Sequence, residues 1–150
     1  MPKQLSTYLL LLFLLSLASC KDSSEFKLCG LGICKPYYFT GLSYQGGLYQ
    51  VEKEIKAHYT PVIDSSNNGV VRVSYKVNCE GELGDVTYET YNLDFAKADL
   101  NPRLTEQLVN AVSKLSAWNP GKIDGGNSVN SHGFLAFKIV NGEITEILPK

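Results

Sequence analysis

The stretch GVVRVSYKVN, residues 69–78, alternates apolar and polar side chains along its whole length. Its apolar positions all fall on one face: Val71, Val73, Tyr75 and Val77. Alternation of β-branched and aromatic residues with a period of two is typical of a half-buried strand. The chain turns at residues 78–81 and returns through a second strand-like segment, 85–93. We expect these two segments to form an antiparallel hairpin.

A second strand pair is predicted near the end of the sequence. The segment 134–140 places Leu135, Phe137 and Ile139 on one face. Asn141-Gly142 follows directly, and this dipeptide is the strongest short signal for a two-residue hairpin turn. We therefore expect residues 143–148 to return as a fourth strand beside 134–140.

Two amphipathic helices complete the pattern. The first spans residues 48–59, where apolar residues recur at spacings of three and four, and Pro61 ends it. The second begins at Asn101-Pro102, with Asn as the N-cap and Pro in the first position, and is expected to run to Trp118. Its apolar stripe consists of Leu104, Leu108, Ala111, Val112 and Leu115. The order α-β-β-α-β-β predicts an α+β fold, an antiparallel sheet of three to four strands packed by two helices.

The N-terminal residues MPKQLSTYLLLLFLLSLASC, 1–20, have the pattern of an export signal. One basic residue precedes an apolar run that is too short for a good membrane span. An uncleaved signal anchor is the alternative. The ending Leu17-Ala18-Ser19-Cys20 resembles the lipobox of bacterial lipoproteins, which implies cleavage before Cys20 and acylation of that cysteine. We therefore expect a signal peptide at 1–19, a lipid-anchored tether at 20–43 and one domain at 44–150.

Three cysteines remain once Cys20 is assigned to the lipid: Cys29, Cys34 and Cys79. Outside the inner membrane the compartment is oxidising, so one disulfide is expected. Either Cys29 and Cys34 close a small Gly-containing loop, or Cys79 joins the tether to the domain. His58 and His132 lie far from these cysteines and show no ligand spacing, so neither a metal site nor a cofactor is predicted.

Charge and motif content exclude several functions. The formal net charge is -1, and Lys and Arg are scattered singly, which argues against nucleic-acid binding. The loop 124–132 contains residue types used in nucleophilic catalysis, namely Asp124, Ser128, Ser131 and His132. Their spacing matches neither a nucleophile elbow nor a catalytic triad, so we expect a non-enzymatic protein.

The order of these segments resembles the C-terminal domain of TonB proteins from Bacteroidetes. The resemblance covers roughly residues 44–148 and rests on the sequence of its parts. Tyr44-Gln45-Gly46-Gly47 precedes a helix, a Val-x-Val-x-Tyr-x-Val strand follows, and a second helix leads to Trp118-Asn119-Pro120-Gly121-Lys122. Gly125 and an aromatic-rich strand come afterwards.

This resemblance implies a protein-binding module of the outer-membrane envelope. The TonB domain binds a short segment of outer-membrane transporters by adding it as a strand beside its third strand, which here is 134–140. The implied partner is an envelope protein, such as an outer-membrane transporter or a protein associated with one. The implied edge residues are Phe134, Ala136, Lys138, Glu143, Thr145 and Ile147.

Two departures from TonB limit that expectation. A lipid anchor and a short tether replace TonB's inner-membrane helix and Pro-rich spacer, so this chain should not energise transport. The Asn141-Gly142 hairpin also lays 143–148 against the docking strand, so a guest strand has to displace it or use its outer edge. The alternatives are a structural envelope lipoprotein that self-associates, for example as a homodimer, and a small-ligand binder or enzyme that uses the 124–132 loop. The sequence leaves open whether the protein faces the periplasm or the cell surface.

Overall fold

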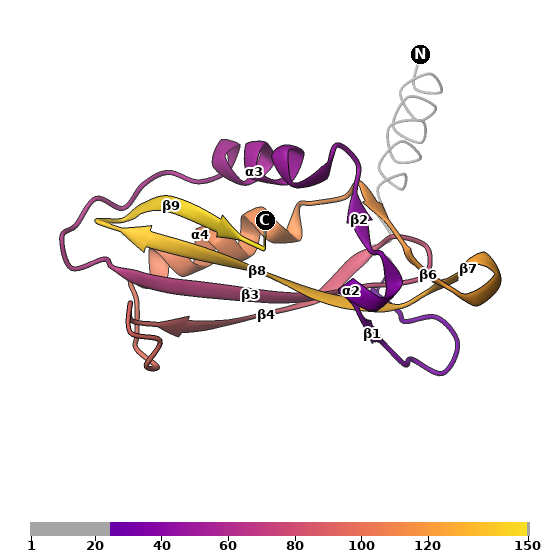
Figure 1. Ribbon diagram of the computed structural model, residues 1–150. Helices are drawn as coiled ribbons and strands as arrows, with labels where there is room; N and C mark the ends of the chain where they lie inside the picture. Colours follow the sequence, from indigo (N-terminus) through magenta and orange to yellow (C-terminus); the bar gives the residue numbers. More distant parts are fainter. Residues whose placement is uncertain (1–24, 150) are drawn as a thin grey trace, which may run out of the picture.

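One sheet organises the computed structural model, which describes residues 25–149 (Figure 1). Its strands lie in the order β1-β8-β3-β4, and β9 also pairs with β8. Only the β1–β8 pairing is parallel; the others are antiparallel. The strands are β1 (Lys35–Pro36), β3 (Gly69–Val77), β4 (Leu83–Tyr91), β8 (Ser131–Val140) and β9 (Glu143–Leu148).

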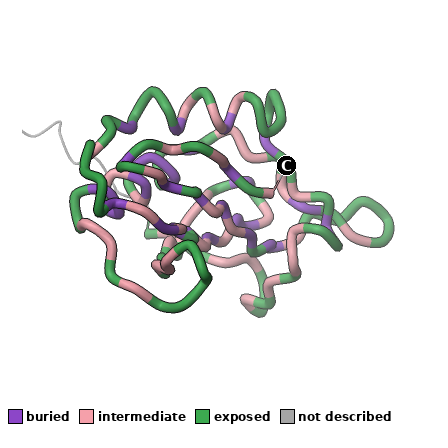
Figure 2. Tube along the Cα trace, turned by 60° about the vertical axis from the view of Figure 1, so that its left-hand side comes forward, coloured by how far each residue is buried: buried purple, intermediate pink, exposed green. Residues whose placement is uncertain are grey.

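Two longer helices pack on this sheet, α3 (Gly47–Ala57) and α4 (Pro102–Ser113), and a single turn, α2 (Tyr37–Thr40), follows β1. In Figure 1, α4 lies behind the sheet and α3 runs beside β9. Figure 2 shows buried positions alternating along the strands, as expected for a sheet with one covered face. The α+β class predicted from the sequence is therefore confirmed.

The predicted core faces are also confirmed. The inward positions of β3 and β8 and the stripe of α4 are all buried: Val71, Val73, Tyr75, Val77, Leu135, Phe137, Ile139, Leu104, Leu108, Ala111, Val112 and Leu115. The start of α4 agrees as well, since the Asn101 side chain accepts a hydrogen bond of 3.0 Å from the backbone N–H of Arg103. Local periodicity and capping were sufficient to place these elements.

The β8–β9 turn forms as predicted and docks onto the chain that follows α3. Asn141 and Gly142 both have left-handed backbone angles, with φ of 52° and 79°. The Gly142 N–H donates to the Asn67 carbonyl at 2.9 Å, and its own carbonyl accepts from the Tyr59 hydroxyl at 2.7 Å. A Cβ at Gly142 would overlap the Val62 carbonyl, so this turn requires glycine for its packing as well as for its φ angle.

The expected end of the second helix is wrong. α4 stops at Ser113, and Trp118–Asn119 forms the short strand β5, paired with β2 (Ser43–Tyr44). The indole of Trp118 lies 5.0 Å from the Tyr44 ring and 4.9 Å from the Tyr75 ring, measured between centroids. These aromatic contacts stabilise an extended chain at Trp118, where the apolar residue alone suggested a last helical turn.

The region expected as a single polar loop contains a small hairpin. Strands β6 (Gly121–Ile123) and β7 (Asn127–Val129) pair with each other, and the 3-10 turn η2 (Asp124–Gly126) connects them. Among residues 25–149, no helix is both long and apolar enough to cross a bilayer. The expected signal peptide and lipobox fall at residues 1–20, outside the described part of the chain.

Candidate functional site

The strand proposed as the docking edge, 134–140, lies within the sheet. β3 pairs with β8 along one side, from Ser131 to Ile139. On the other side, β9 pairs with Ala136–Val140 and β1 pairs with Ser131–His132. Ala136 and Lys138 are thus flanked by strands on both sides, as the Asn141-Gly142 hairpin implied.

A gap in this pairing is associated with an apolar groove. Neither β1 nor β9 reaches residues 133–135 of β8 in the described registers. A cavity of about 340 Å³ lies beside Phe134 and Leu135, and Tyr37, Leu48, Trp118 and Pro149 are among its other lining residues. Leu48, the first residue of the helix expected at 48–59, is 38% exposed and borders this groove.

The tyrosines and the tryptophan that line this groove differ in whether their polar atoms have hydrogen-bond partners. The Tyr44 hydroxyl donates to a Glu54 carboxylate oxygen at 2.8 Å. Burial and this bond raise the pKa of Tyr44, and burial raises the pKa of Tyr75 well above its usual value. Nε1 of Trp118 is buried and has no acceptor within the described chain. Both phenols therefore stay neutral, and the Trp118 N–H is a buried donor without a partner in the described chain.

The outer edge of β9 is the part of the predicted site that stays unpaired. Within the described sheet β9 pairs with β8 alone. Glu143 and Thr145 are exposed, whereas Ile147 is 5% exposed and belongs to the core. The β8–β9 register shifts next to Thr145, whose hydroxyl donates to the Lys138 carbonyl at 3.2 Å. A short edge strand with a register irregularity limits uncontrolled pairing, and no other strand of the described sheet lies along its outer side.

Helix α3 forms a wall along this edge. Its residues Glu52 and Lys56 line a second hollow of about 300 Å³ together with Thr145. Its earlier residues Leu48 and Val51 line the apolar groove. Both hollows therefore border α3: the second lies between α3 and β9, and the apolar groove lies beyond the end of β9, beside Pro149.

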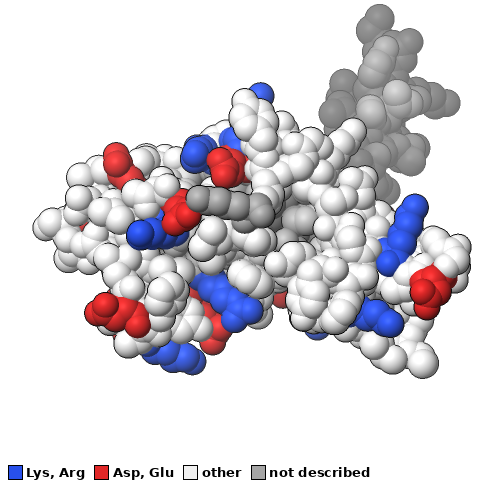
Figure 3. All heavy atoms as spheres, in the orientation of Figure 1, with Lys and Arg blue, Asp and Glu red and all other residues white. Residues whose placement is uncertain are grey.

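Charged side chains contribute no dominant sign to the face shown in Figure 3, where Lys and Arg are interspersed with Asp and Glu. Their ion pairs are exposed; for example, Lys76 and Asp85 lie 2.8 Å apart, with side chains 39% and 51% exposed. The hydrogen bond from Lys76 to Asp85 raises the pKa of Lys76. Exposed pairs of this kind add little stability. Net charge therefore does not single out a partner of one sign for this face.

The residues of the alternative enzymatic site are not brought together. Asp124 and Ser128 are exposed on the β6–β7 hairpin. Ser131 is buried, and its hydroxyl hydrogen-bonds that of Thr40 at 2.8 Å. His132 is the next residue on β8, so its side chain points to the opposite face of the sheet. Among the described residues, no group of three or more His, Cys, Asp and Glu is placed to hold a metal ion.

His58 lies at a helix end. It follows α3 as its C-cap residue, is exposed, and its Nδ1 lies 2.9 Å from the Glu54 carbonyl oxygen. A contact of this kind with a carbonyl of the last helical turn stabilises the end of α3.

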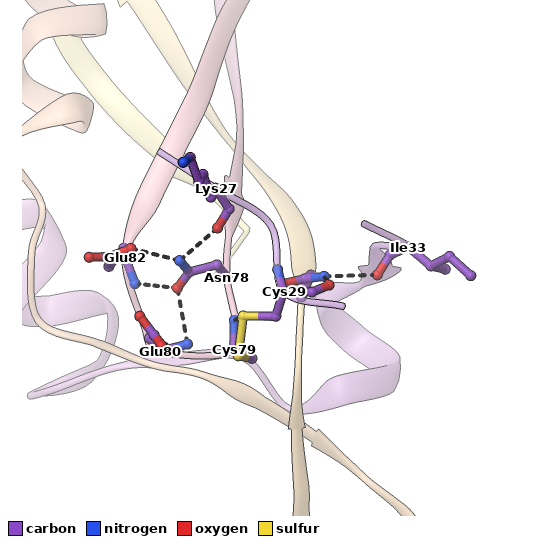
Figure 4. The surroundings of a disulfide bond; sticks show 8 residues. Lys27, Cys29, Ile33, Asn78, Cys79, Glu80 and Glu82 are labelled. Atoms are coloured by element: carbon purple, nitrogen blue, oxygen red, sulfur yellow. Dashed lines mark hydrogen bonds between the residues drawn. A yellow bond between two sulfur atoms is a disulfide. The ribbon is translucent and has the colours of Figure 1, made fainter. Parts of the chain in front are cut away.

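The predicted disulfide is present and joins Cys29 to Cys79, with a separation of 50 residues (Figure 4). The structure thereby selects the pairing between tether and domain. Cys34 remains a free, partly buried thiol whose pKa is raised by burial. Residues expected in the tether therefore belong to the packed region, and Phe26 lies against Gly84, where any Cβ would overlap its ring.

Asn130 holds the loop beside this disulfide, and no local sequence pattern indicated it. Its Oδ1 accepts from the Cys29 N–H at 2.9 Å, and its Nδ2 donates to the carbonyls of Cys29 and Ile33 at 2.9 and 3.3 Å. Its backbone carbonyl accepts from the Lys35 N–H at 3.0 Å. Asn130 is 4% exposed, so these bonds fix the loop 29–34 against β8.

Substituting this residue tests the fixation. Asn130→Ala is expected to lower the free energy of unfolding by about 2 kcal/mol, because the Cys29 N–H loses its acceptor next to the core. Urea unfolding followed by circular dichroism measures the change. Asn110→Ala, at an exposed position of α4, is the matched control and should leave stability nearly unchanged. Equal effects of the two variants would contradict the role given to Asn130.

No protein-family model, no curated protein and no solved structure matches this chain.

Proposed function

We propose that this protein is a non-enzymatic, lipid-anchored module of the cell envelope that binds a partner protein by strand addition. The observation that carries the proposal is the outer edge of β9, which is unpaired in the described sheet and lies next to the apolar groove. The lipobox-like Leu17-Ala18-Ser19-Cys20 and the resemblance of 44–148 to the TonB C-terminal domain support it.

The partner segment would lie extended between α3 and β9. Backbone N–H and C=O groups of β9 supply hydrogen bonds that need no particular side chain. Beyond the end of β9, the groove at Phe134 and Trp118 accepts one apolar or aromatic side chain of the guest, and the Trp118 Nε1 offers a donor once the ring adjusts. The guest is therefore an extended segment with an apolar residue near one end.

The anchor makes this a stationary binder. Because Cys29 is bonded to Cys79 and Phe26 packs against Gly84, no more than the stretch between Cys20 and Cys29 is left of the tether expected at 20–43. Those residues span at most about 30 Å when fully extended. A module held this close to its membrane does not transmit force across the periplasm, so it is a docking protein and not an energiser of transport.

Site-specific photo-crosslinking tests the edge. A photo-reactive amino acid at Glu143 or Thr145 is expected to capture the same partner protein from living cells, and one at Asn110 of α4 to capture none. With the purified pair, amide hydrogen exchange across 143–148 should slow on complex formation, because the guest strand protects outward N–H groups. Capture from position 110 alone, or exchange that does not change, rules out strand addition at β9. A crosslink between two copies of this chain would instead favour the self-associating alternative.

A further inference from the structure

Several of the most exposed large apolar side chains fall in one short segment. Leu31 is 94% exposed, Ile33 67%, Tyr38 67% and Phe39 73%. Single exposed apolar residues are common on protein surfaces and need no explanation. Four of these side chains within residues 31–39, near the beginning of the described chain, exceed such scattered exposure.

The loop that carries Leu31 and Ile33 is held in a defined shape. Cys29 is fixed by the disulfide and by Asn130, and the Ile33 carbonyl also accepts from Asn130. Gly30 and Gly32 adopt left-handed angles on either side of Leu31, with φ of 59° and 73°. In Figure 4 the Ile33 side chain extends away from the disulfide and from the strands behind it. Burial of these apolar side chains against a surface outside this domain would therefore be favourable.

If Cys20 carries the predicted lipid anchor, the bilayer is the apolar surface nearest to this loop. Cys20 precedes Cys29 by nine positions (29 minus 20), a distance of at most about 30 Å in an extended chain. The disulfide therefore keeps Leu31 and Ile33 within reach of the bilayer that holds the acyl chains. Lys27 and Lys35 flank the loop and are exposed, where their ammonium groups suit anionic lipid head groups. Tyr38 and Phe39 are ring types that settle at the head-group level.

We propose that Leu31 and Ile33 insert into the boundary between head groups and acyl chains, with the aromatic pair Tyr38–Phe39 beside them. This inference rests on the lipid anchor of the proposed function. The loop makes a second, reversible contact with the bilayer. Because the anchor already holds the domain at the membrane, this contact forms at a high effective concentration. Its consequence is orientation: the domain stands with its 29–34 end on the bilayer, and the opposite end of β3 points away from it.

Fluorescence quenching tests this contact with the full-length lipidated protein. Leu31→Trp is reconstituted into phosphatidylethanolamine–phosphatidylglycerol vesicles, with and without brominated acyl chains. The unsubstituted protein provides the background of Trp118. The matched control is Ile63→Trp, because Ile63 is 69% exposed and lies in the loop before β3, at the far end of the sheet in Figure 1. We expect the indole at position 31 to lose roughly half or more of its emission, and the indole at position 63 to lose none.

The outcomes separate this inference from the anchor. Mass measurement of the N-terminal peptide decides acylation of Cys20 independently. An acylated protein whose indole at position 31 is not quenched overturns the bilayer contact and leaves the anchor standing. A protein without acylation of Cys20 overturns the anchor. In that protein, quenching at position 31 would still support the bilayer contact, and a lack of quenching would refute it.

Self-association is a further outcome. If the emission maximum of the indole at position 31 shifts to the blue with protein concentration in the absence of vesicles, the surface binds a second copy of this chain, and the inference is refuted. An intact Cys29–Cys79 bond in each variant confirms that the loop is formed.

Discussion

Replacing Cys29 and Cys79 together by alanine is expected to lower the free energy of unfolding by about 4 kcal/mol. The bond closes a sequence separation of 50 residues, and a chain without it regains the conformational freedom that this closure removes from the unfolded state. The native state also loses the contact between the Cys79 N–H and Cys29 Sγ at 3.2 Å. Because small domains are stable by only about 5–15 kcal/mol, this change removes a large share of the total.

Denaturant unfolding of the oxidised variants measures the effect, and Cys34→Ala provides the control. Cys34 is free and partly buried, so its loss should cost far less. Limited proteolysis gives a local readout: cleavage after Lys27 and Lys35 should accelerate in the double alanine variant, because residues 25–34 lose their covalent attachment. If the double variant and Cys34→Ala were equally stable, the Cys29–Cys79 bond would not contribute to the free energy of unfolding.

Phe137→Ala is expected to lower the free energy of unfolding by about 3–5 kcal/mol. Phe137 is fully buried on β8, between its strand partners Val71 on β3 and Ile147 on β9. Removing its ring deletes buried apolar area and leaves a cavity. Strands β3, β8 and β9 cannot move in to close it, because their backbone hydrogen bonds fix their spacing.

The matched control is Phe39→Ala, which removes the same ring from a side chain that is 73% exposed. In solution without vesicles its unfolding midpoint should barely move. The urea midpoint of Phe137→Ala should fall while the m-value stays constant, which would place the loss in native packing. A comparable loss in both variants would contradict the assignment of Phe137 to the core.

Local sequence patterns determined much of the fold. Period-two alternation identified the inward faces of β3 and β8, and Asn141-Gly142 identified the β8–β9 hairpin. The same dipeptide showed that β9 would cover the strand expected to dock a partner, and this is what the ladders show. Each of these inferences depends on neighbours within a few residues, where side-chain direction and backbone angles are set directly by the sequence.

The remaining features depend on residues that meet across long sequence separations. Asn130 bonds Cys29 over 101 residues, and β1 joins β8 over a similar distance. Trp118 becomes part of a strand because the rings of Tyr44 and Tyr75 pack against it, although its own neighbours suggested the end of a helix.

The candidate surfaces divide in the same way. The sequence by itself predicted β9 and left one disulfide unassigned among Cys29, Cys34 and Cys79. The tertiary structure alone decided that Cys79 is the partner of Cys29 and that Leu31 and Ile33 are held outward. The reason is physical: periodicity encodes which face of an element is buried, whereas pairing partners and exposed loops are chosen by packing the whole chain at once.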